Sequence, residues 1–310
     1  MKLRKRGGDL PPVAYILTGG YAAGVSPMLA AISMRLLRLI HPAVKIRLLM
    51  DPETTKHLDR IDGDGFLFRK IAESITIETD ASDGIESNRF IKTQLPRWME
   101  GPFLYLDNDT LPVRNFDGIY DRRFDFAAAP DFLDGTQSHV CPERFRELYE
   151  DSGWDFPPAR YLNGGVFAAN GGANAKSLFQ EWHRRWDACR ERGIPVDQPA
   201  LNSLWADGKW NLRVLPKEYN ALIEVDERFS RRARVYHYTS SYAQLSGYLL
   251  MDWIAKLEKG EEIEAESTEF LRTAYPWKDE SHARRHWLTG NHVRAARVFL
   301  KKKIQREGAV

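Results

Sequence analysis

The chain has 310 residues, with 45 basic and 43 acidic side chains and a formal net charge of +2. This near balance leaves no global basic field, which argues against nucleic acid as the main partner. The length and apolar content allow one large α/β domain with an appendage, or two domains. The separated cysteines Cys141 and Cys189 fit a reduced, cytosolic setting. Residues 7–12 interrupt the basic amino terminus, so we expect neither a signal peptide nor a membrane span.

The first third of the chain alternates between strand and helix patterns. Strands are expected at 13–17, 44–50 and 74–77, with a helix at 27–39 and another beyond the second strand. This order predicts a doubly wound, mostly parallel α/β sheet, in which ligands bind beyond the carboxyl ends of the strands. The glycine-rich loop at 18–24 is either a ligand-binding loop or an ordinary turn.

Cationic side chains precede the most informative strand. Residues 87–98 predict a helix in which Arg89 and Lys92, three positions apart, share one face. These cations could meet a phosphate or a sugar that lies near a metal ion. A solvated surface pair is the alternative, because helical Arg and Lys side chains are mostly exposed.

The stretch 103–111 reads Phe-Leu-Tyr-Leu-Asp-Asn-Asp-Thr-Leu. Its four apolar residues predict a buried strand that stops at Asp107 and Asp109. Two carboxylates separated by one residue at a strand end can reach one divalent cation, and their hard oxygens suit Mg²⁺ or Mn²⁺. Taken alone, the pattern is more often a set of turn residues.

Two later stretches place polar groups at the ends of strands. The strand at 124–131 ends in Asp131, and Asn163, Gly164 and Gly165 precede a β-favouring run. The Asn-Gly-Gly pattern by itself is typical of a hairpin or a bulge. In a ligand site it would supply an amide and a bare backbone.

A short helix and a late strand complete the candidate site. Residues 195–202 open a helix for which Asp197 is a plausible N-cap. The functional alternative has Asp197 and Gln198 facing the hydroxyls of a polyol. The strand at 234–239 bears His237, and a lone histidine is more often packed or exposed than a ligand.

The remaining segments have weaker patterns. Residues 132–160 fit an acceptor loop or lid, or equally a peripheral helix with loops. The chain beyond 242 is predicted to be helical, and 283–304 mix apolar and basic residues. Such helices either touch acidic lipid or form a solvated cap. We therefore predict a catalytic domain over 1–241 and a helical extension over 242–310.

Together these motifs resemble the metal-dependent GT-A glycosyltransferases. The likeness is greatest to the family 8 group, which includes glycogenin and the lipopolysaccharide galactosyltransferases, and it spans roughly 13–239. The motifs occur in the family's order. They are the helix with Lys92, then 104–110, 129–131, 163–166, 197–202 and 235–238.

The resemblance implies a GT-A fold, which is a Rossmann-like, mostly parallel central sheet flanked by helices. It also implies a retaining transferase whose donor is a nucleoside-diphosphate sugar, with UDP-sugar expected. In this family pattern Asp107, Asp109 and His237 would ligate Mn²⁺ or Mg²⁺. Donor-binding roles would fall to Thr18, Tyr21, Arg89, Lys92, Asn108, Asn163, Gly164 and Gly165, and catalytic roles to Asp131, Asp197 and Gln198.

One departure from the family concerns the diphosphate. The family commonly follows its histidine with a glycine and then a lysine, and 239–244 contain neither. Arg231, Arg232 or Arg234 could substitute for that lysine. Lys92 also stands where an arginine is frequent, which keeps the charge and changes the hydrogen-bond geometry.

Three other protein functions share features with the predicted glycosyltransferase. A haloacid-dehalogenase-like phosphatase would carry Thr or Val where the chain has Leu111. It would also show a later adjacent acidic pair, and the chain has no Asp-Asp, so this function is excluded. A sugar-nucleotide pyrophosphorylase would have Thr-Arg after its glycine-rich loop, which 18–24 lacks. A non-catalytic sugar-nucleotide-binding protein of the same fold stays open, because the expected lysine is missing.

We therefore predict a metal-dependent glycosyltransferase that acts on a glycan, a lipid-linked glycan or a protein. We expect it in the cytoplasm, with the basic carboxyl-terminal helices as the part that would contact the inner face of a membrane. Nucleic acid is not an expected partner.

Overall fold

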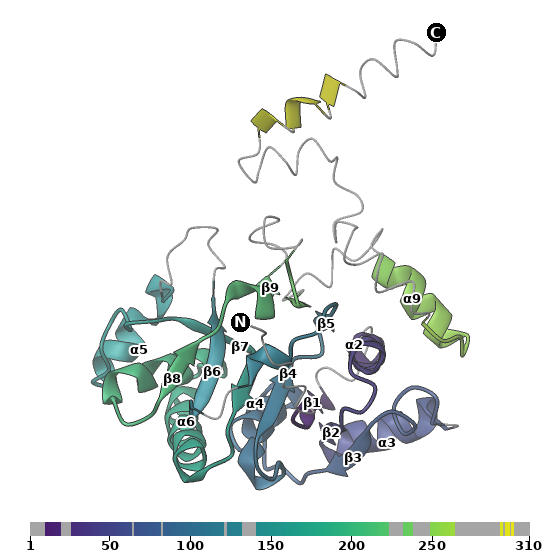
Figure 1. Cartoon of the computed structure of the whole chain (residues 1–310). Coiled ribbons are helices and arrows are strands. Elements are labelled where there is room, and N and C mark those ends of the chain that lie inside the picture. Colours follow the sequence, from purple (N-terminus) through teal and green to yellow (C-terminus); the bar gives the residue numbers. More distant parts are fainter. Residues whose placement is uncertain are drawn as a thin grey trace.

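The computed structural model describes residues 10–19, 26–63, 65–81, 83–120, 123–131, 141–222, 232–237 and 249–263, and a few residues between 292 and 300. A seven-stranded sheet forms the centre of the described part, with helices on both of its faces (Figure 1). A second sheet of three strands stands at its carboxyl edge. The predicted α/β class, with a mostly parallel central sheet flanked by helices, is confirmed.

The large sheet has the strand order β3-β2-β1-β4-β7-β6-β8. Strand β7 runs antiparallel to its neighbours β4 and β6, and the other pairings are parallel. The small sheet has the order β5-β10-β9. The strands are β1 (Val13–Leu17), β2 (Ile46–Met50), β3 (Glu73–Thr76), β4 (Phe103–Leu106), β5 (Thr110–Pro112), β6 (Phe126–Pro130), β7 (Leu162–Ala169), β8 (Leu212–Val214), β9 (Ala221–Leu222) and β10 (Val235–His237).

Helices connect and cover these strands. The α-helices are α2 (Ser26–Ile40), α3 (Pro52–Ile61), α4 (Gly84–Lys92), α5 (Arg146–Asp151), α6 (Ala173–Glu191), α7 (Gln198–Ser203) and α9 (Leu249–Glu258). Short 3-10 helices are η1 (Leu95–Arg97), η2 (Asp117–Ile119), η3 (Glu143–Phe145), η4 (Leu204–Asp207) and η5 (Lys217–Tyr219).

Alternation along the central strands divides the core into two layers. In β1, Val13 and Tyr15 face a cluster that includes buried residues of α2 and α9, whereas Ala14 and Ile16 face a cluster that includes α6 and α7. Strands β1, β4 and β6 are therefore buried along their whole length, as expected for strands covered on both sides. This burial fixes the strands firmly, so the groups at their carboxyl ends are held in place.

The predicted helix at 87–98 is shorter than expected. Helix α4 ends at Lys92 with Thr93 as its C-cap, and the separate turn η1 follows. Pro96 accounts for the break, because proline lacks the N–H that would continue the helix. The Asn-Gly-Gly stretch is also not a hairpin, since Asn163 lies inside β7.

The carboxyl-terminal extension is described only in part. Helix α9 packs through Trp253, Ile254 and Leu257 into the same cluster as α2. The predicted boundary at 241/242 and most of 283–304 lie outside the described residues, so the division into domains stays a prediction. Among the described helices, none is both long and apolar enough to cross a membrane.

A charge cluster on α6 leads to a prediction about acid stability. Arg184 and Arg185 donate to the carboxylate of Glu181 at 2.6–2.8 Å. Hydrogen bonds from Arg184 are the largest influence on the pKa of Glu181 and outweigh the opposing effect of burial, lowering it from 4.5 to about 2. A depressed carboxyl pKa stabilises the fold above the unfolded-state pKa, and this contribution is lost as the pH falls through the folded-state pKa.

We predict that Glu181→Gln lowers the free energy of unfolding by about 1–2 kcal/mol at pH 7, since Arg184 is largely exposed and screened. The difference from the wild type should shrink as the pH falls from 4.5 toward 2. Urea unfolding between pH 7 and pH 3 measures it, with the exposed Glu191→Gln as the matched control. A difference that stays constant with pH would contradict the assignment.

Candidate functional site

Three potential metal ligands converge at the carboxyl edge of the large sheet. Asp107 and Asp109 follow β4, and β10 pairs with β5 so that His237 stands opposite Thr110. The Nε2 atom of His237 lies 3.3 Å from Asp109 Oδ1 and 4.0 Å from Asp107 Oδ2. One ligand atom from each residue falls within 4.8 Å of the others. We call Asp107, Asp109 and His237 the candidate triad.

Gly165 is needed for this approach. A Cβ atom at that position would stand 2.2 Å from His237 Cε1 and 2.8 Å from Asp107 Oδ2, too close for either contact. The backbone of β7 therefore forms a wall against the candidate triad, and only glycine fits there. Gly164 is less restricted, because its Cβ would meet Lys92 Nζ at an ordinary 3.5 Å.

A chain of hydrogen bonds sets the ring state of His237. The amide N–H of Gly165 can only donate, and it donates to Asn163 Oδ1 at 2.8 Å. Asn220 Nδ2 donates to the same oxygen at 2.9 Å, which leaves Asn220 Oδ1 to face His237 Nδ1 at 2.9 Å. His237 must then carry a proton on Nδ1. In the neutral ring, the lone pair is on Nε2, the nitrogen that faces the carboxylates.

Lys92 is buried and Arg89 is partly buried, and both lie against carboxylates rather than on the solvated surface. The ammonium of Lys92 lies 3.4 Å from Asp107 Oδ1 and 3.8 Å from Asp197 Oδ2. Arg89 Nε lies 3.0 Å from Asp197 Oδ1. The Lys92 ammonium also sits over the ring of Tyr105, 4.8 Å from its centroid, and the Tyr105 hydroxyl donates to Asp107. The expectation of a solvated surface pair is therefore wrong for these cations, and their contact with a phosphate or a sugar stays a prediction.

These charges shift two pKa values in opposite directions. Burial by itself would raise the pKa of Asp107, but the charges of Lys92, His237 and Arg89 outweigh it and hold that pKa below its ordinary value. Burial would lower the pKa of His237, and the carboxylates of Asp109 and Asp107 instead raise it. The site is thus an alternating arrangement of anions and cations whose side chains are largely buried.

Asp197 is not a helix cap, in contrast to the simpler expectation. It precedes α7 without a capping hydrogen bond, and its carboxylate pairs with Arg89 and Lys92 instead. Helix α6 holds the backbone of Asp197 in place, because Trp182 Nε1 donates to the Asp197 carbonyl at 3.0 Å. Trp186 holds the Pro195 carbonyl in the same way at 2.9 Å.

Gln198 and Asp131 form a pair next to Asp197. Gln198 Nε2 donates to Asp131 Oδ2 at 2.5 Å, which joins the start of α7 to the end of β6. Asp131 follows the carboxyl end of β6, and Gln198 is the first residue of α7. Asn108, between the two aspartates of the candidate triad, is buried, and its Oδ1 has no hydrogen-bond partner within the described structure.

The nucleoside side of the predicted site is only partly described. Thr18 is fully buried at the end of β1 and donates its hydroxyl to the Gly84 carbonyl at 2.6 Å. Tyr21 lies outside the described residues, as does Arg231. Arg234, a candidate for the missing lysine, instead donates to the Asn115 carbonyl and lies over the Tyr219 ring. The donor roles given to Thr18 and Tyr21 stay predictions.

Comparison with known proteins agrees with this geometry. Residues 99–242 match the model of the nucleotide-diphospho-sugar transferase family, and this segment contains the whole candidate triad. The galactosyltransferase LgtC, solved with donor and acceptor sugar analogues, superposes with a TM-score of 0.52 at 14% identity, covering 84% of this chain and 99% of its own. The expected GT-A glycosyltransferase resemblance is confirmed.

A second solved structure has the same fold. The glycosyltransferase GlyE of Streptococcus pneumoniae TIGR4 superposes with a TM-score of 0.51 at 18% identity, covering 88% of this chain and 66% of its own. At such identities the structural likeness shows the fold alone, and the glycosyltransferase class is supported by the family match over residues 99–242. No protein of curated function matches the chain.

Sequence reasoning missed three residues that organise the candidate site. Asn220 orients His237, Tyr105 contacts Asp107, and Trp182 supports Asp197. Tyr105 lies two positions before Asp107, so strand alternation could have placed the two on one face. Asn220 had no such signal, because it is far in sequence from both Asn163 and His237.

The chain of hydrogen bonds that runs through Asn220 to His237 predicts that Asn220→Ala weakens metal binding. Without Asn220 Oδ1, the Nδ1 proton of His237 is no longer fixed, and lost outer contacts of this kind cost about 10–100-fold in metal affinity. Isothermal titration with MnCl₂ measures the dissociation constant, with the exposed Asn174→Ala as control. Thermal melting of the metal-free variant checks that it folds. Unchanged Mn²⁺ affinity in a folded Asn220→Ala protein would refute the role.

Proposed function

We propose that the chain is a metal-dependent glycosyltransferase that moves a sugar from a nucleoside-diphosphate sugar, with UDP as the expected nucleotide, to a hydroxyl of an acceptor. The acceptor would be a glycan, a lipid-linked glycan or a protein, and the anomeric configuration would be retained. The single observation that carries this proposal is the convergence of the candidate triad with the buried cation Lys92 and the partly buried cation Arg89. The family match over the same residues supports it.

The residues of the candidate triad fit a divalent cation. Two carboxylates and a neutral imidazole nitrogen are a donor set that suits Mn²⁺, and Mg²⁺ accepts the carboxylates. When bound, the ion would supply a Lewis acid that stabilises the negative charge left on the diphosphate. The aspartate pair is then the D-x-D motif of this site.

The surrounding residues divide the remaining work. Arg89 and Lys92 hold positive charge at the carboxyl edge, where charge on a leaving diphosphate would develop. The unpartnered oxygen of Asn108 is an acceptor for a donor hydroxyl. Asp197, Gln198 and Asp131 would hold the sugar hydroxyls, with Gln198 beside the anomeric carbon. Asn163, Gly164 and Gly165 would form the backbone wall beside the sugar.

Two proposals about location rest on separate observations. Cys141 and Cys189 are buried free thiols, which supports a reducing, cytoplasmic setting. The basic residues of 283–304 support contact with acidic lipid at the inner face of a membrane. Because the acceptor could be free or held in a membrane, the acceptor assay below includes both free and lipid-linked glycans.

We predict that the protein, supplied with Mn²⁺, releases a nucleoside diphosphate from one member of a panel of nucleotide sugars. Asp109→Asn should reduce this rate at least about 100-fold, since a Lewis acid contributes several kcal/mol. The exposed Asp155→Asn makes the same chemical change outside the site and should leave the rate unchanged. The measurement is nucleoside-diphosphate release, first without acceptor and then with free or lipid-linked glycans.

The alternative function is sugar-nucleotide binding without turnover. The absence of the family's lysine after His237 favours it, because Arg234 is engaged with Asn115. Binding of a nucleotide sugar with no release or transfer under any of these conditions would decide for this alternative. Mn²⁺-dependent release that Asp109→Asn abolishes would exclude it.

A further inference from the structure

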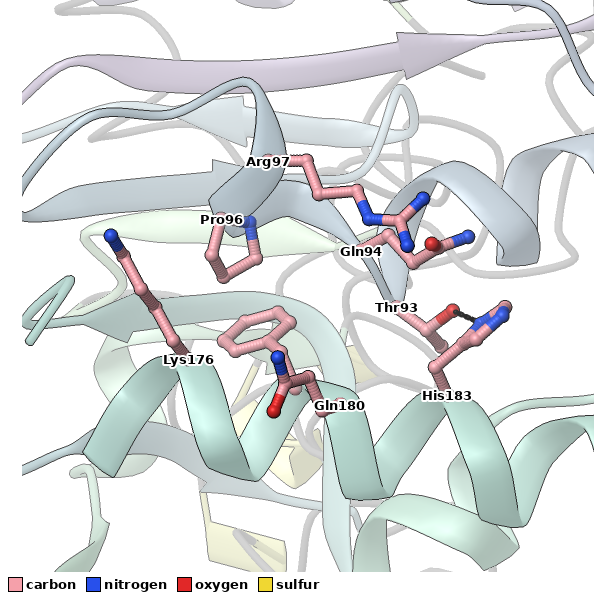
Figure 2. Close-up of a pocket in the computed structure, with 8 residues that line it drawn as sticks. Thr93, Gln94, Pro96, Arg97, Lys176, Gln180 and His183 are labelled. Carbon is pink, nitrogen blue, oxygen red and sulfur yellow. Dashed lines mark hydrogen bonds between the residues drawn. The ribbon is translucent and has the colours of Figure 1, made fainter. Parts of the chain in front are cut away.

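A pocket lies outside the candidate site, between the face of α6 and the segment that joins α4 to η1. It has a volume of about 230 Å³ and is lined by Thr93, Gln94, Pro96, Arg97, Lys176, Phe179, Gln180 and His183 (Figure 2). Figure 2 shows Lys176 at one end and the hydrogen-bonded Thr93–His183 pair at the other. None of these eight residues belongs to the candidate triad or to its cation pairs.

The lining residues carry positive charge without matching carboxylates. Lys176 and Arg97 are exposed at the rim, and neither forms an ion pair in the described parts of the chain. The eight lining residues include no aspartate or glutamate. Asp187, the nearby acid on α6, is paired with Arg190 at 2.7 Å. The rim is therefore suited to an anion.

The interior of the pocket offers acceptors as well as cations. The Thr93 hydroxyl donates to the Arg89 carbonyl at 2.8 Å, so it must accept from His183 Nδ1, which leaves His183 Nε2 as an acceptor in the neutral ring. Burial lowers the pKa of His183 and keeps it in that neutral state at neutral pH. Gln94 donates its Nε2 to the Phe90 carbonyl, which leaves its carbonyl oxygen to accept.

The combination limits the class of ligand. An inorganic anion or simple polycarboxylate needs donors only, whereas these acceptors require a ligand that also carries hydroxyl groups. Phe179 and Pro96 add an apolar surface against which a ring can lie. A pocket of about 230 Å³ is smaller than the roughly 300–1,000 Å³ typical of drug-sized ligands, which limits the ligand to about one ring.

We propose that this pocket binds an acidic monosaccharide unit, with its carboxylate on Lys176 at one end and its hydroxyls on Arg97, Gln94 and His183 at the other (Figure 2). The site is independent of the candidate triad and of any metal ion. It would recognise the sugar either free or as a unit within a glycan, and the same chemistry serves both sources.

Saturation-transfer NMR in metal-free buffer tests the proposal. The probes are D-glucuronate, its neutral counterpart D-glucose, and citrate as an anion without a ring. Saturation should transfer strongly from the protein to bound glucuronate. A glucuronate-containing disaccharide distinguishes a sugar carried within a glycan from the free sugar. The double variant Lys176→Gln with Arg97→Gln should weaken glucuronate binding at least about tenfold, since it removes both charge-assisted contacts.

The controls separate this pocket from the rest of the protein. Lys56→Gln changes an exposed lysine on α3 in the same way and should leave binding unchanged. Both pocket cations are exposed, so the double variant should fold, and its melting temperature checks this. Equal binding of citrate or of glucose would overturn the acidic-sugar assignment. No glucuronate signal, or a signal that the double variant retains, would overturn the site itself.

Discussion

The structure of the candidate site depends on one electrostatic constraint, the sharing of the Lys92 ammonium between Asp107 and Asp197. All three groups are held at the carboxyl edge of the sheet, and Lys92 and Asp197 are almost fully buried. Removing one partner from a buried pair leaves an uncompensated charge, which costs about 3–5 kcal/mol. The carboxylates needed for a cation can therefore stand close together only because Lys92 and Arg89 offset them in the metal-free chain.

This constraint explains how distant elements serve one site. Helix α4 is packed against the sheet to bring Lys92 to Asp107, and α6 fixes Asp197 through the indole of Trp182. The small sheet brings His237 to the same edge, where Gly165 leaves room for its ring. The aromatic residues of α6 are thus more than core packing, because Trp182 sets the position of the carboxylate that pairs with Lys92.

Local patterns in the sequence were enough to predict the strand that ends at Asp107 and the helix that carries Lys92. The ligand role of His237 came only from the family's order of motifs, because a lone histidine carries no local signal. The residues around Gly165 in the sequence indicate only a turn motif, because nothing in them reveals that a side chain from β10 approaches this glycine. Asn220 could not be found for the same reason: its partners meet it only in the folded chain.

The central claim is that the candidate triad holds a divalent cation that binds a nucleoside diphosphate, and thermal melting tests it most directly. The protein would be melted with UDP, GDP, ADP or CDP, each with and without Mn²⁺, beside Asp109→Ala. A ligand that binds the native state raises the melting temperature by mass action. The account predicts a Mn²⁺-dependent rise with one nucleotide, UDP being expected, and no rise in Asp109→Ala. No rise with any nucleotide in the presence of Mn²⁺, or an equal rise in Asp109→Ala, would contradict it.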